Sequence, residues 1–324
     1  MANLAGVSRA TVSRVLNNYT DKFSVRPEVR KRVIDAAESL GYRPDLMAHI
    51  LRKKDNSGLV GWLGAMHPFT FSSNVLDVMA DTLSRKGFLL SPMYSANSDA
   101  TIELPWWRLD AAVVSGVRTV DDVEVIENAN IPYVCINCLC GPGGSSVQMD
   151  DSMGMELACR HLMELGHRRI AYAVRDPQFM GKHPSVSMRK EAYAKIMREN
   201  GLNPISSENQ FFVDEPEKFI MEIIERKKAT AIITYSSHSG ILLLGALQRA
   251  GFHVPHDISL VTFNDEYPLS HMFPSMTVVD LDGRAAGQAA SNMIINMLGD
   301  AEFESTHEVI PETLIVREST APPK

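Results

Sequence analysis

The strongest constraint on the fold of this chain is a regular alternation of short β-rich runs with amphipathic stretches over residues 58–324. Eight runs rich in β-branched and aromatic residues predict strands: LVGWLGAM, FLLSPMY, AAVVSG, YVCINC, RIAYAV, TAIITYS, SLVTFND and MTVVDL. Most segments between them are amphipathic, and several end at a glycine, which is typical of a helix C-terminus. Repeated strand–helix units predict α/β architecture with parallel sheets covered by helices on both faces. The region is long enough for two doubly wound subdomains with a cleft between them.

A basic head precedes this region. Residues 1–54 hold eleven Lys and Arg against five Asp and Glu, although the whole chain has a net charge of −7. A basic surface on an acidic body is typical of polyanion binding, because each phosphate contact releases counterions. A solvated basic surface is the alternative that charge alone leaves open.

The head contains signals for short helices. Ser8 is a predicted N-cap whose hydroxyl accepts a hydrogen bond from the backbone N–H of Thr11, and Gly6 suits the tight turn before it. A further helix is predicted from Pro27, which suits a first helical position, to Leu40. The apolar face of the helix that begins at Arg9 carries Val12, Val15 and Leu16.

The opposite face of that helix carries a small residue, a hydroxyl, a guanidinium and an amide, at Ala10, Ser13, Arg14 and Asn17. Arginine pairs with guanine, asparagine pairs with adenine, and small or hydroxyl side chains fit beside them. A carboxylate on this face would lie against phosphates, and residues 3–18 contain none. The pattern predicts a small all-α helix-turn-helix domain over residues 1–43 that enters the major groove of DNA.

The stretches LAGVSRATVSRVLNN and VRPEVRKRVIDAAESLGYRP resemble the head of the LacI/GalR family of bacterial transcription regulators. The resemblance implies that the base-reading positions of the second helix are Arg9, Ala10 and Arg14. It implies that the positions contacting phosphate or supporting base contacts are Ser8, Thr11, Ser13 and Asn17. Fewer residues precede Ala2 than in that family, so the first helix is expected to be nearly absent.

The next stretch, DLMAHILRKKDNSG, resembles the hinge helix of the same family, and residues 44–57 are expected to form this helix and a linker. The segment is too short to be a stable helix alone, and the resemblance implies that it orders on DNA. Leu51 matches the side chain that wedges into the minor groove and kinks the duplex, with Ala48 and Arg52 beside it. An ordinary apolar linker is the alternative.

Four stretches of the α/β region, MELGHRRIAYAV, MRKEAYAKIMRENGL, GALQRAGFHVPHDISLVTFND and PSMTVVDLDGRAAGQAA, resemble the effector domain of this family, which is of periplasmic-binding-protein type. The resemblance implies an effector-binding and dimerisation domain over residues 58–324 whose chain crosses between two subdomains three times. The crossings are expected near Met155–Leu165, near Thr277–Asp282 and after Ala301. The subdomains are expected at about 58–157 with 283–300, and at about 158–282 with 301–324.

Ligands of open α/β sheets bind beyond the carboxyl ends of the strands. The residues predicted to lie there include Asn137 and Asp265, together with the predicted effector-binding residues Phe71, Arg189, Ser236 and Asn264. The resemblance implies that Arg189 donates hydrogen bonds to the effector and that Phe71 forms a wall of the pocket.

The stretch TFND stands where the family often has GFDD, so the amide of Asn264 replaces a carboxylate that accepts bonds from two sugar hydroxyls. A sugar or small polyol is the expected effector. A sugar phosphate, a purine-like ring or no effector are the alternatives, and a purely structural role at the strand end is the alternative for Asn264.

Catalytic motifs are missing from the sequence. The GPGG stretch lacks the lysine and hydroxyl of a phosphate-binding loop, and no nucleophile elbow occurs. The adjacent pair Asp150 and Asp151 is not expected to act as a catalytic dyad, because adjacent side chains seldom face each other. The thiols of CINCLC could share a zinc ion, but alternate residues of a strand point to opposite faces, which favours structural thiols. We therefore expect no enzyme, no cofactor and no metal site.

The sequence also bears on where the protein acts. Four cysteines fit a reducing compartment. No apolar run reaches the roughly 18 residues that cross a bilayer, and the first residues lack the apolar core of a signal peptide. We expect a cytoplasmic protein without a membrane partner.

The sequence as a whole predicts a sequence-specific DNA-binding transcription regulator, expected to be a repressor. Its partners would be double-stranded operator DNA, a small-molecule effector such as a sugar, and further copies of itself in a homodimer or tetramer. The alternative is a small-molecule binding protein without productive DNA binding, because the first helix is short.

Overall fold

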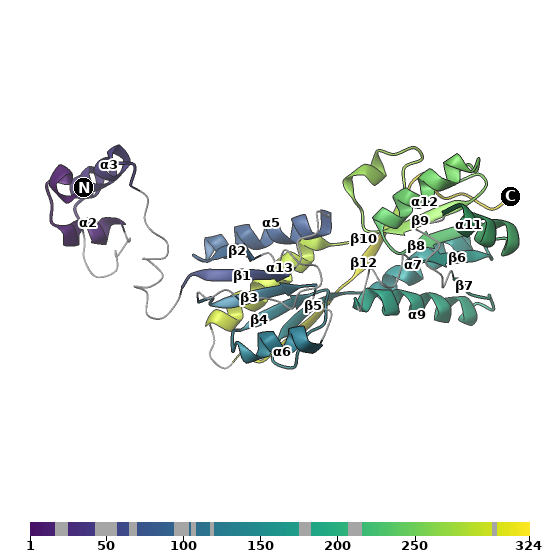
Figure 1. Ribbon diagram of the computed structural model, residues 1–324, viewed down its shortest axis with the longest axis horizontal. Helices are drawn as coiled ribbons and strands as arrows, with labels where there is room; N and C mark the ends of the chain where they lie inside the picture. Colours follow the sequence, from purple (N-terminus) through teal and green to yellow (C-terminus); the bar gives the residue numbers. More distant parts are fainter. Residues whose placement is uncertain are drawn as a thin grey trace. The chain divides into compact units, whose positions relative to one another are not determined.

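The computed structural model describes residues 1–16, 25–42, 57–64, 70–93, 104, 108–116, 120–174, 183–206, 216–299 and 303–324 (Figure 1). The chain divides into two compact units, Met1–Gly58 and Leu59–Lys324. Within the described ranges, no helix combines the length and apolarity needed to span a bilayer.

The described residues of the first unit form the helices α1 (Ala2–Ala5), α2 (Arg9–Leu16) and α3 (Pro27–Ser39). Gly6 ends α1 in a left-handed conformation, with φ of 62°, which glycine adopts without strain. Pro27 occupies the first turn of α3 as predicted. The helices share a small core of buried apolar side chains from Ala5, Val15, Val33 and Ala36. The three predicted elements of the head are thus confirmed, with a first helix of one turn.

The first sheet of the second unit has the strand order β11-β5-β4-β3-β1-β2, and all its neighbouring strands are parallel. Its strands are β1 (Leu59–Gly64), β2 (Leu89–Met93), β3 (Ala111–Ser115), β4 (Tyr133–Ile136), β5 (Ser145–Met149) and β11 (His307–Ile310). Helices α5 (Thr70–Arg85) and α13 (Gly283–Gly299) cover one face of this sheet, and α6 (Val120–Asn128) covers the other (Figure 1). Alternate residues of β3 are buried against the helices on opposite faces of the sheet. Because both faces are covered, the strand reads as the continuous apolar run AAVV.

The second sheet has the strand order β12-β10-β9-β8-β6-β7, with β12 antiparallel to β10 and the other neighbours parallel. Its strands are β6 (Ile170–Ala173), β7 (Ile205–Ser206), β8 (Ala231–Thr234), β9 (Ser259–Phe263), β10 (Thr277–Leu281) and β12 (Glu312–Ile315). Helices α7 (Asp151–Glu164) and α9 (Pro184–Glu199) cover one face. The other face is covered by α11 (Pro216–Ile220), the π-helix η1 (Met221–Arg226) and α12 (Ser237–Arg249). A 3-10 turn, η2 (Tyr267–Ser270), follows β9.

The predicted fold class is confirmed, since two sheets, parallel except for the edge strand β12, have helices on both faces and follow a small helical unit. The eight strands predicted from sequence are β1–β4, β6 and β8–β10. The sequence analysis missed β5, β7, β11 and β12. β5 reads SSVQM and is too polar to stand out, β7 has two residues, and β11 and β12 are short and separated by Pro311.

The chain passes between the two sheets at Asp150, at Asp282 and at Pro311. The first passage comes earlier than the predicted window Met155–Leu165. Its cause is local: the Asp150 side chain accepts a hydrogen bond from the backbone N–H of Met153 and caps α7, so the whole helix packs on the second sheet. The strand β11 pairs with β5 and therefore belongs to the first sheet, whereas the sequence placed all of 301–324 with the second subdomain.

Gly154 in the first turn of α7 leaves no room for a side chain, because a Cβ there would overlap Oε2 of the buried Glu312 and lie 2.9 Å from Cγ1 of Val279. Gly154→Ala is therefore expected to lower the free energy of unfolding by roughly 1–3 kcal/mol, the usual cost of overpacking. The matched control is Gly245→Ala in α12, where the nearest atom is the flexible end of Arg249 at 3.4 Å. This control is expected to raise stability by about 0.5–1 kcal/mol through helix propensity. Urea unfolding measures the stability of both variants, and equal effects of the two changes would contradict the close packing assigned to Gly154.

Candidate functional site

The first candidate site is the outward face of α2. The hydroxyl of Ser8 accepts a hydrogen bond from the backbone N–H of Thr11 at 3.1 Å, which confirms the predicted N-cap. Val15 is buried, and Val12 and Leu16 pack against the core of the unit. The opposite face is consequently turned outward, with Arg9, Ala10 and Arg14 exposed and with Thr11 and Ser13 half-buried. Asn17 and the hinge residues Ala48, Leu51 and Arg52 lie outside the described residues.

The second candidate site lies at the carboxyl ends of the strands of the second unit. Two asparagines occupy equivalent places there, Asn137 after β4 and Asn264 after β9, each the third strand in its sheet. Both have positive φ, 48° and 69°, a conformation that asparagine tolerates better than most residues. Their backbone N–H groups donate to Val147 O and Val279 O, both at 2.8 Å. Both side chains are half-buried. The two sheets thus present an amide at matching strand ends.

Ser236 follows β8 and caps α12, because its hydroxyl accepts a hydrogen bond from the N–H of Ser239 at 3.5 Å. It therefore has a structural role at the same edge of the sheet where the sequence predicts effector contact.

Arg189 is fully enclosed by the second unit, with 2% of its surface exposed. Its Nε–H donates to Oδ1 of Asp151 at 2.5 Å, and Nη1 donates to the carbonyl oxygen of Tyr235 at 2.7 Å. The guanidinium carbon lies 3.8 Å from the centroid of the Phe263 ring. Tyr235 and Phe263 directly precede Ser236 and Asn264, so three of the predicted effector residues converge at one edge of the sheet.

Glu312, the first residue of β12, completes this buried ion cluster. Its Oε1 lies 3.5 Å from Nη2 of Arg189, and neither carboxylate oxygen accepts a hydrogen bond from the described residues. Two carboxylates, from Asp151 and Glu312, therefore share one guanidinium in the interior. Burial raises the pKa of Glu312 to about 8, the Arg189 charge acts in the opposite direction, and the Asp151 charge adds to the rise. For Arg189, burial lowers the pKa, but the two carboxylates together raise it above its usual range.

Phe71, the fourth predicted effector residue, is placed near the others by a bond between the two subdomains. The backbone N–H and the hydroxyl of Thr70 both donate to Oε2 of Glu266, at 2.7 and 2.6 Å. Thr70 begins α5 on the first sheet, and Glu266 lies two residues after Asn264. A carboxylate at a helix N-terminus is also favoured by the helix dipole. This pair links the two subdomains at the edge that carries the candidate site.

The sequence analysis missed Glu312 and Glu266 and considered Asp151 only as half of an unlikely catalytic pair. Glu312 gave no signal because β12 was not recognised as a strand, and its partner Arg189 is far away in the sequence. Glu266 lies in a polar stretch whose pairing with Thr70 no local pattern reveals.

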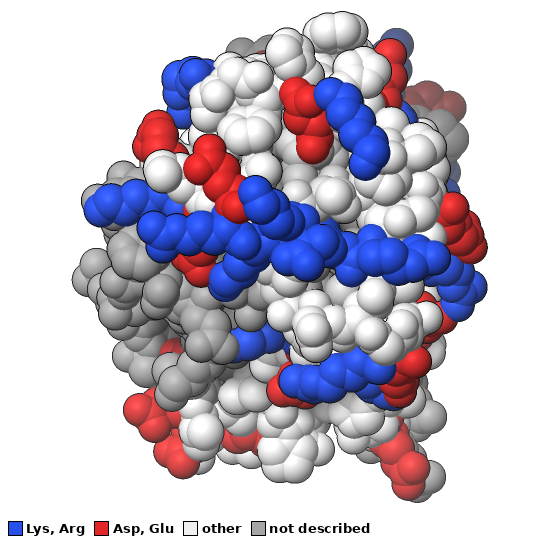
Figure 2. Space-filling view, turned by 90° about the vertical axis from the view of Figure 1, so that its right-hand side faces the viewer, with Lys and Arg blue, Asp and Glu red and all other residues white. Residues whose placement is uncertain are grey.

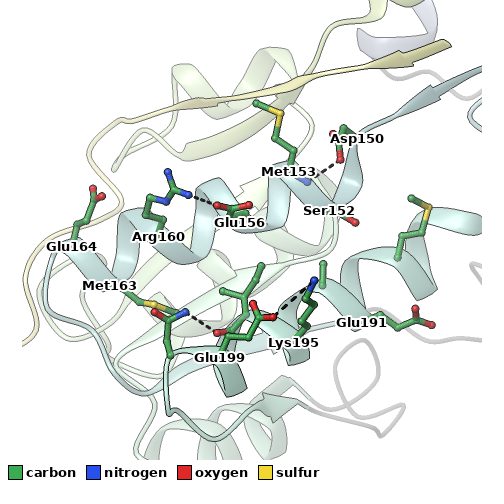
Figure 3. Close-up of a pocket in the computed structure, with 14 residues that line it drawn as sticks. Asp150, Ser152, Met153, Glu156, Arg160, Met163, Glu164, Glu191, Lys195 and Glu199 are labelled. Carbon is green, nitrogen blue, oxygen red and sulfur yellow. Dashed lines mark hydrogen bonds and ion pairs between the residues drawn. The ribbon is translucent and has the colours of Figure 1, made fainter.

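A groove of about 950 Å³ between α7 and α9 lies apart from these residues (Figure 3). Its walls carry charged side chains paired along each helix, such as Arg160 with Glu156 and Lys195 with Glu199. None of the four predicted effector residues lines it. The groove is therefore separate from the candidate effector site.

A band of Lys and Arg side chains crosses one end of the second unit (Figure 2). Cations at the amino ends of the second-sheet strands cap the helices that finish there. Nη1 of Arg168 donates to the carbonyl of Met163 in α7, and Nε of Arg169 donates to the carbonyls of Lys227 and Lys228 after η1. Helix C-termini attract cations, which accounts for the positions of Arg168 and Arg169.

The four cysteines are free thiols, with Cys135, Cys138 and Cys159 buried and Cys140 half-buried. Among the described residues, no group of His, Cys, Asp or Glu is arranged to hold a metal ion.

Comparison with known proteins decides the family. The description "Bacterial regulatory proteins, lacI family" matches residues 1–45, and "Periplasmic binding protein-like domain" matches residues 159–320. The chain belongs to the lacI family of bacterial regulatory proteins. The predicted family and the reading as a DNA-binding transcription regulator are confirmed, and the alternative of a binding protein without DNA binding is not supported.

Individual relatives agree with this membership in the lacI family. The ribose operon repressor of Halalkalibacterium halodurans is 29% identical over 330 residues, which cover 99% of this chain and 96% of that protein. The lac repressor dimer bound to operator and the anti-inducer ONPF has the same fold, with a TM-score of 0.77 at 22% identity over 99% of this chain and 97% of that one. The complex of the transcriptional regulator CelR with cellobiose has a TM-score of 0.67 at 23% identity, covering 98% of each chain. Transcription regulators of this kind are not enzymes.

The protonation of Glu312 makes stability depend on pH. In the unfolded chain a glutamate loses its proton near pH 4.3, whereas in the folded protein Glu312 keeps it up to about pH 8. The folded state binds the extra proton between these values, so the free energy of unfolding falls as pH rises from about 4.3 to about 8, by at most about 1.4 kcal/mol per pH unit.

Glu312→Gln is expected to remove this slope, and Glu308→Gln on the exposed side of β11 is expected to retain it. Urea unfolding at pH 5, 6, 7, 8 and 9 measures the difference. A Glu312→Gln profile parallel to that of the unchanged protein would contradict the assignment.

Proposed function

We propose that this regulator is a cytoplasmic repressor that acts as a homodimer and whose affinity for operator DNA is set by a sugar-type effector bound between its two subdomains. Two heads related by a two-fold axis would read a pseudo-palindromic site, with half-sites about 34–36 Å apart. The repressor role and the sugar are supported by the names of the relatives, a ribose operon repressor and a regulator in complex with cellobiose.

The observation that carries the DNA-binding part of the proposal is the outward face of α2. Arg9, Ala10 and Arg14 are exposed on a helix whose apolar face is fixed against the small core. A guanidinium in this place offers the paired donors that recognise guanine in the major groove. Ser8, Thr11 and Ser13 beside it are suited to phosphate oxygens. The proposal extends to Asn17 on the same helix and to a minor-groove wedge formed by Leu51 with Ala48 and Arg52.

The effector part of the proposal rests on the convergence of Arg189, Ser236 and Asn264 at the carboxyl edge of the second sheet. It also rests on the bond from Thr70 to Glu266, which brings the start of α5, and with it Phe71, to the segment after β9. In open α/β sheets the carboxyl edge is the usual ligand site. Arg189 supplies hydrogen-bond donors, Asn264 supplies both a donor and an acceptor, and Phe71 supplies an apolar wall for a sugar ring. An adjacent hydroxyl from Ser236 adds a further polar contact.

The hydrogen bonds between Thr70 and Glu266 link effector binding to the separation of the two subdomains. They join α5 of one subdomain to the segment after β9 of the other, beside Phe71 and Asn264. A ligand that enters between these residues changes the separation of the subdomains and so the stability of these bonds. The operator-bound and free states differ in that separation, and by reciprocity operator DNA changes effector affinity by the same factor.

Arg14→Ala tests the proposed base reading. The change is expected to lower affinity for the specific operator by about 1–3 kcal/mol, because a bidentate contact with guanine is lost, while affinity for random duplex changes little. Fluorescence anisotropy with both duplexes at one fixed salt concentration gives the comparison. The matched control Arg226→Ala, an exposed arginine of the second unit, is expected to leave both affinities unchanged. An equal loss on the two duplexes would show that Arg14 contacts only phosphate.

Asn264→Gly tests the proposed effector contact. Glycine accepts the positive φ of this position, so the change removes the amide without straining the backbone. The affinity for a sugar that shifts the melting temperature of the unchanged protein is expected to fall by about 0.5–1.5 kcal/mol, the usual net value of a hydrogen bond. The matched control is Asn130→Gly, a second positive-φ asparagine after α6. Calorimetric titration measures both, and an equal effect of the two changes would misplace the site.

A further inference from the structure

The proposed effector site offers no uncompensated buried cation in the part of the chain that the structure describes. Arg189 is the only Lys or Arg in that part with a buried side chain. Two carboxylates already lie at ion-pair distance from it, Asp151 at 2.5 Å and Glu312 at 3.5 Å. The neighbouring guanidinium of Arg317 binds both carboxylate oxygens of Asp265, at 2.8 and 2.6 Å. An anion brought into this site would find its cations already paired.

Competition for Arg189 would also destabilise the protein. Both carboxylate oxygens of Glu312 lack a hydrogen-bond donor among the described groups, so Arg189 is the nearest compensation for its charge. A phosphate that drew the guanidinium toward itself would leave Asp151 as a buried, unpaired anion, and above about pH 8 Glu312 as a second one. Leaving a buried charge without its partner is strongly unfavourable.

An uncharged polyol does not compete with the carboxylates for the charge of Arg189. The guanidinium has five N–H donors, of which two take part in the hydrogen bonds to Asp151 and to the Tyr235 carbonyl. The remaining donors of Arg189 are buried in the described structure, and a polyol whose hydroxyl oxygens reach them leaves the charge of Arg189 with the two carboxylates. The amide of Asn264, at the adjoining strand end, is uncharged as well.

We propose that Asp151 and Glu312 together set the charge class of the effector, so that the site accepts an uncharged sugar and rejects the phosphorylated form of the same sugar, with Glu312 strengthening the rejection at high pH. The inference rests on the proposed effector site. Glu312 is a positioning residue in it, because it acts through Arg189 and does not itself need to touch the effector.

The groups that face Glu312 make this selectivity depend on pH. Arg189 faces it from α9, Asp150 and Asp151 from the start of α7, and Asp280 from β10. Because the pKa of Glu312 is raised to about 8, at pH 7 the proton is held and Asp151 alone balances Arg189. Above pH 8 the cluster gains one negative charge. Rejection of a phosphate therefore holds at pH 7 and strengthens by pH 9.

The experiment compares sugars with their phosphates by calorimetric titration of the full-length protein at pH 7 and pH 9. The pairs are D-glucose with D-glucose 6-phosphate, D-ribose with D-ribose 5-phosphate, and cellobiose with cellobiose 6′-phosphate. The phosphates are mostly doubly charged at both pH values, since their second pKa is near 6. For the pair whose sugar binds, the sugar is expected to bind at least about tenfold more tightly than its phosphate at pH 7, with a larger ratio at pH 9.

In the Glu312→Gln variant, the ratio of sugar affinity to phosphate affinity is expected to be the same at pH 9 as at pH 7. In the control Glu308→Gln, this ratio is expected to be larger at pH 9, as in the unchanged protein. A structural role of Glu312 alone would lower both affinities and leave the pH dependence of their ratio intact. If the Glu312→Gln variant does not fold, the ratio of sugar affinity to phosphate affinity of the unchanged protein, compared between pH 7 and pH 9, still tests the role of Glu312. A constant ratio overturns the role of Glu312.

Two further outcomes separate this inference from the function on which it rests. A phosphate that binds as tightly as its sugar overturns the charge selectivity but upholds a small-molecule site. If no member of any pair binds, the proposed sugar effector is itself refuted, and the selectivity falls with it.

Discussion

The architecture of the effector unit depends on one buried guanidinium. Arg189 lies on α9. Its guanidinium contacts the first residue of α7, the first residue of β12 and the carbonyl of Tyr235, which directly follows β8. Asp151 follows the first passage between the sheets, and Glu312 follows the third. The ion cluster therefore holds two of the three connecting segments against the second subdomain. A buried ion cluster of this kind contributes more to a fixed geometry than to net stability, because desolvation offsets much of the attraction.

This arrangement changes what an effector can do. The arginine that the family resemblance assigns to effector binding is already bonded, so a ligand must redistribute existing contacts and cannot simply add new ones. Removing Arg189 would leave two buried carboxylates without a cation, at a cost of about 3–5 kcal/mol, and a loss of effector response would then reflect instability. Asn264, whose positive φ glycine can adopt, is the better position at which to separate binding from folding.

Sequence periodicity was sufficient for the central strands and insufficient for the edges. The apolar runs of the eight predicted strands arise because both faces of a parallel sheet are covered. β11 and β12 have one neighbour each in their sheets and are separated by a proline, so their four-residue patterns resemble loops. The rule that ligands bind at strand ends singled out Ser236 and Asn264, and the family resemblance singled out Arg189, whose side chain the structure places beside them; their contact with an effector stays a prediction. The partners Glu312 and Glu266 are brought in from distant segments by tertiary packing, which no local period encodes.

The charge distribution separates two basic surfaces that arise for different reasons. The outward face of α2 presents exposed Arg9 and Arg14, whereas Arg168 and Arg169 of the second unit donate to carbonyls at the ends of α7 and η1. A band of Lys and Arg also crosses one end of the second unit (Figure 2). Residues 55–324 hold 21 Lys and Arg against 34 Asp and Glu, so the body as a whole repels a DNA backbone. Residues 1–54, with eleven Lys and Arg against five Asp and Glu, carry the excess of positive charge. The slope of operator affinity against salt then reports the phosphate contacts of the head and hinge, because each contact contributes about one counterion.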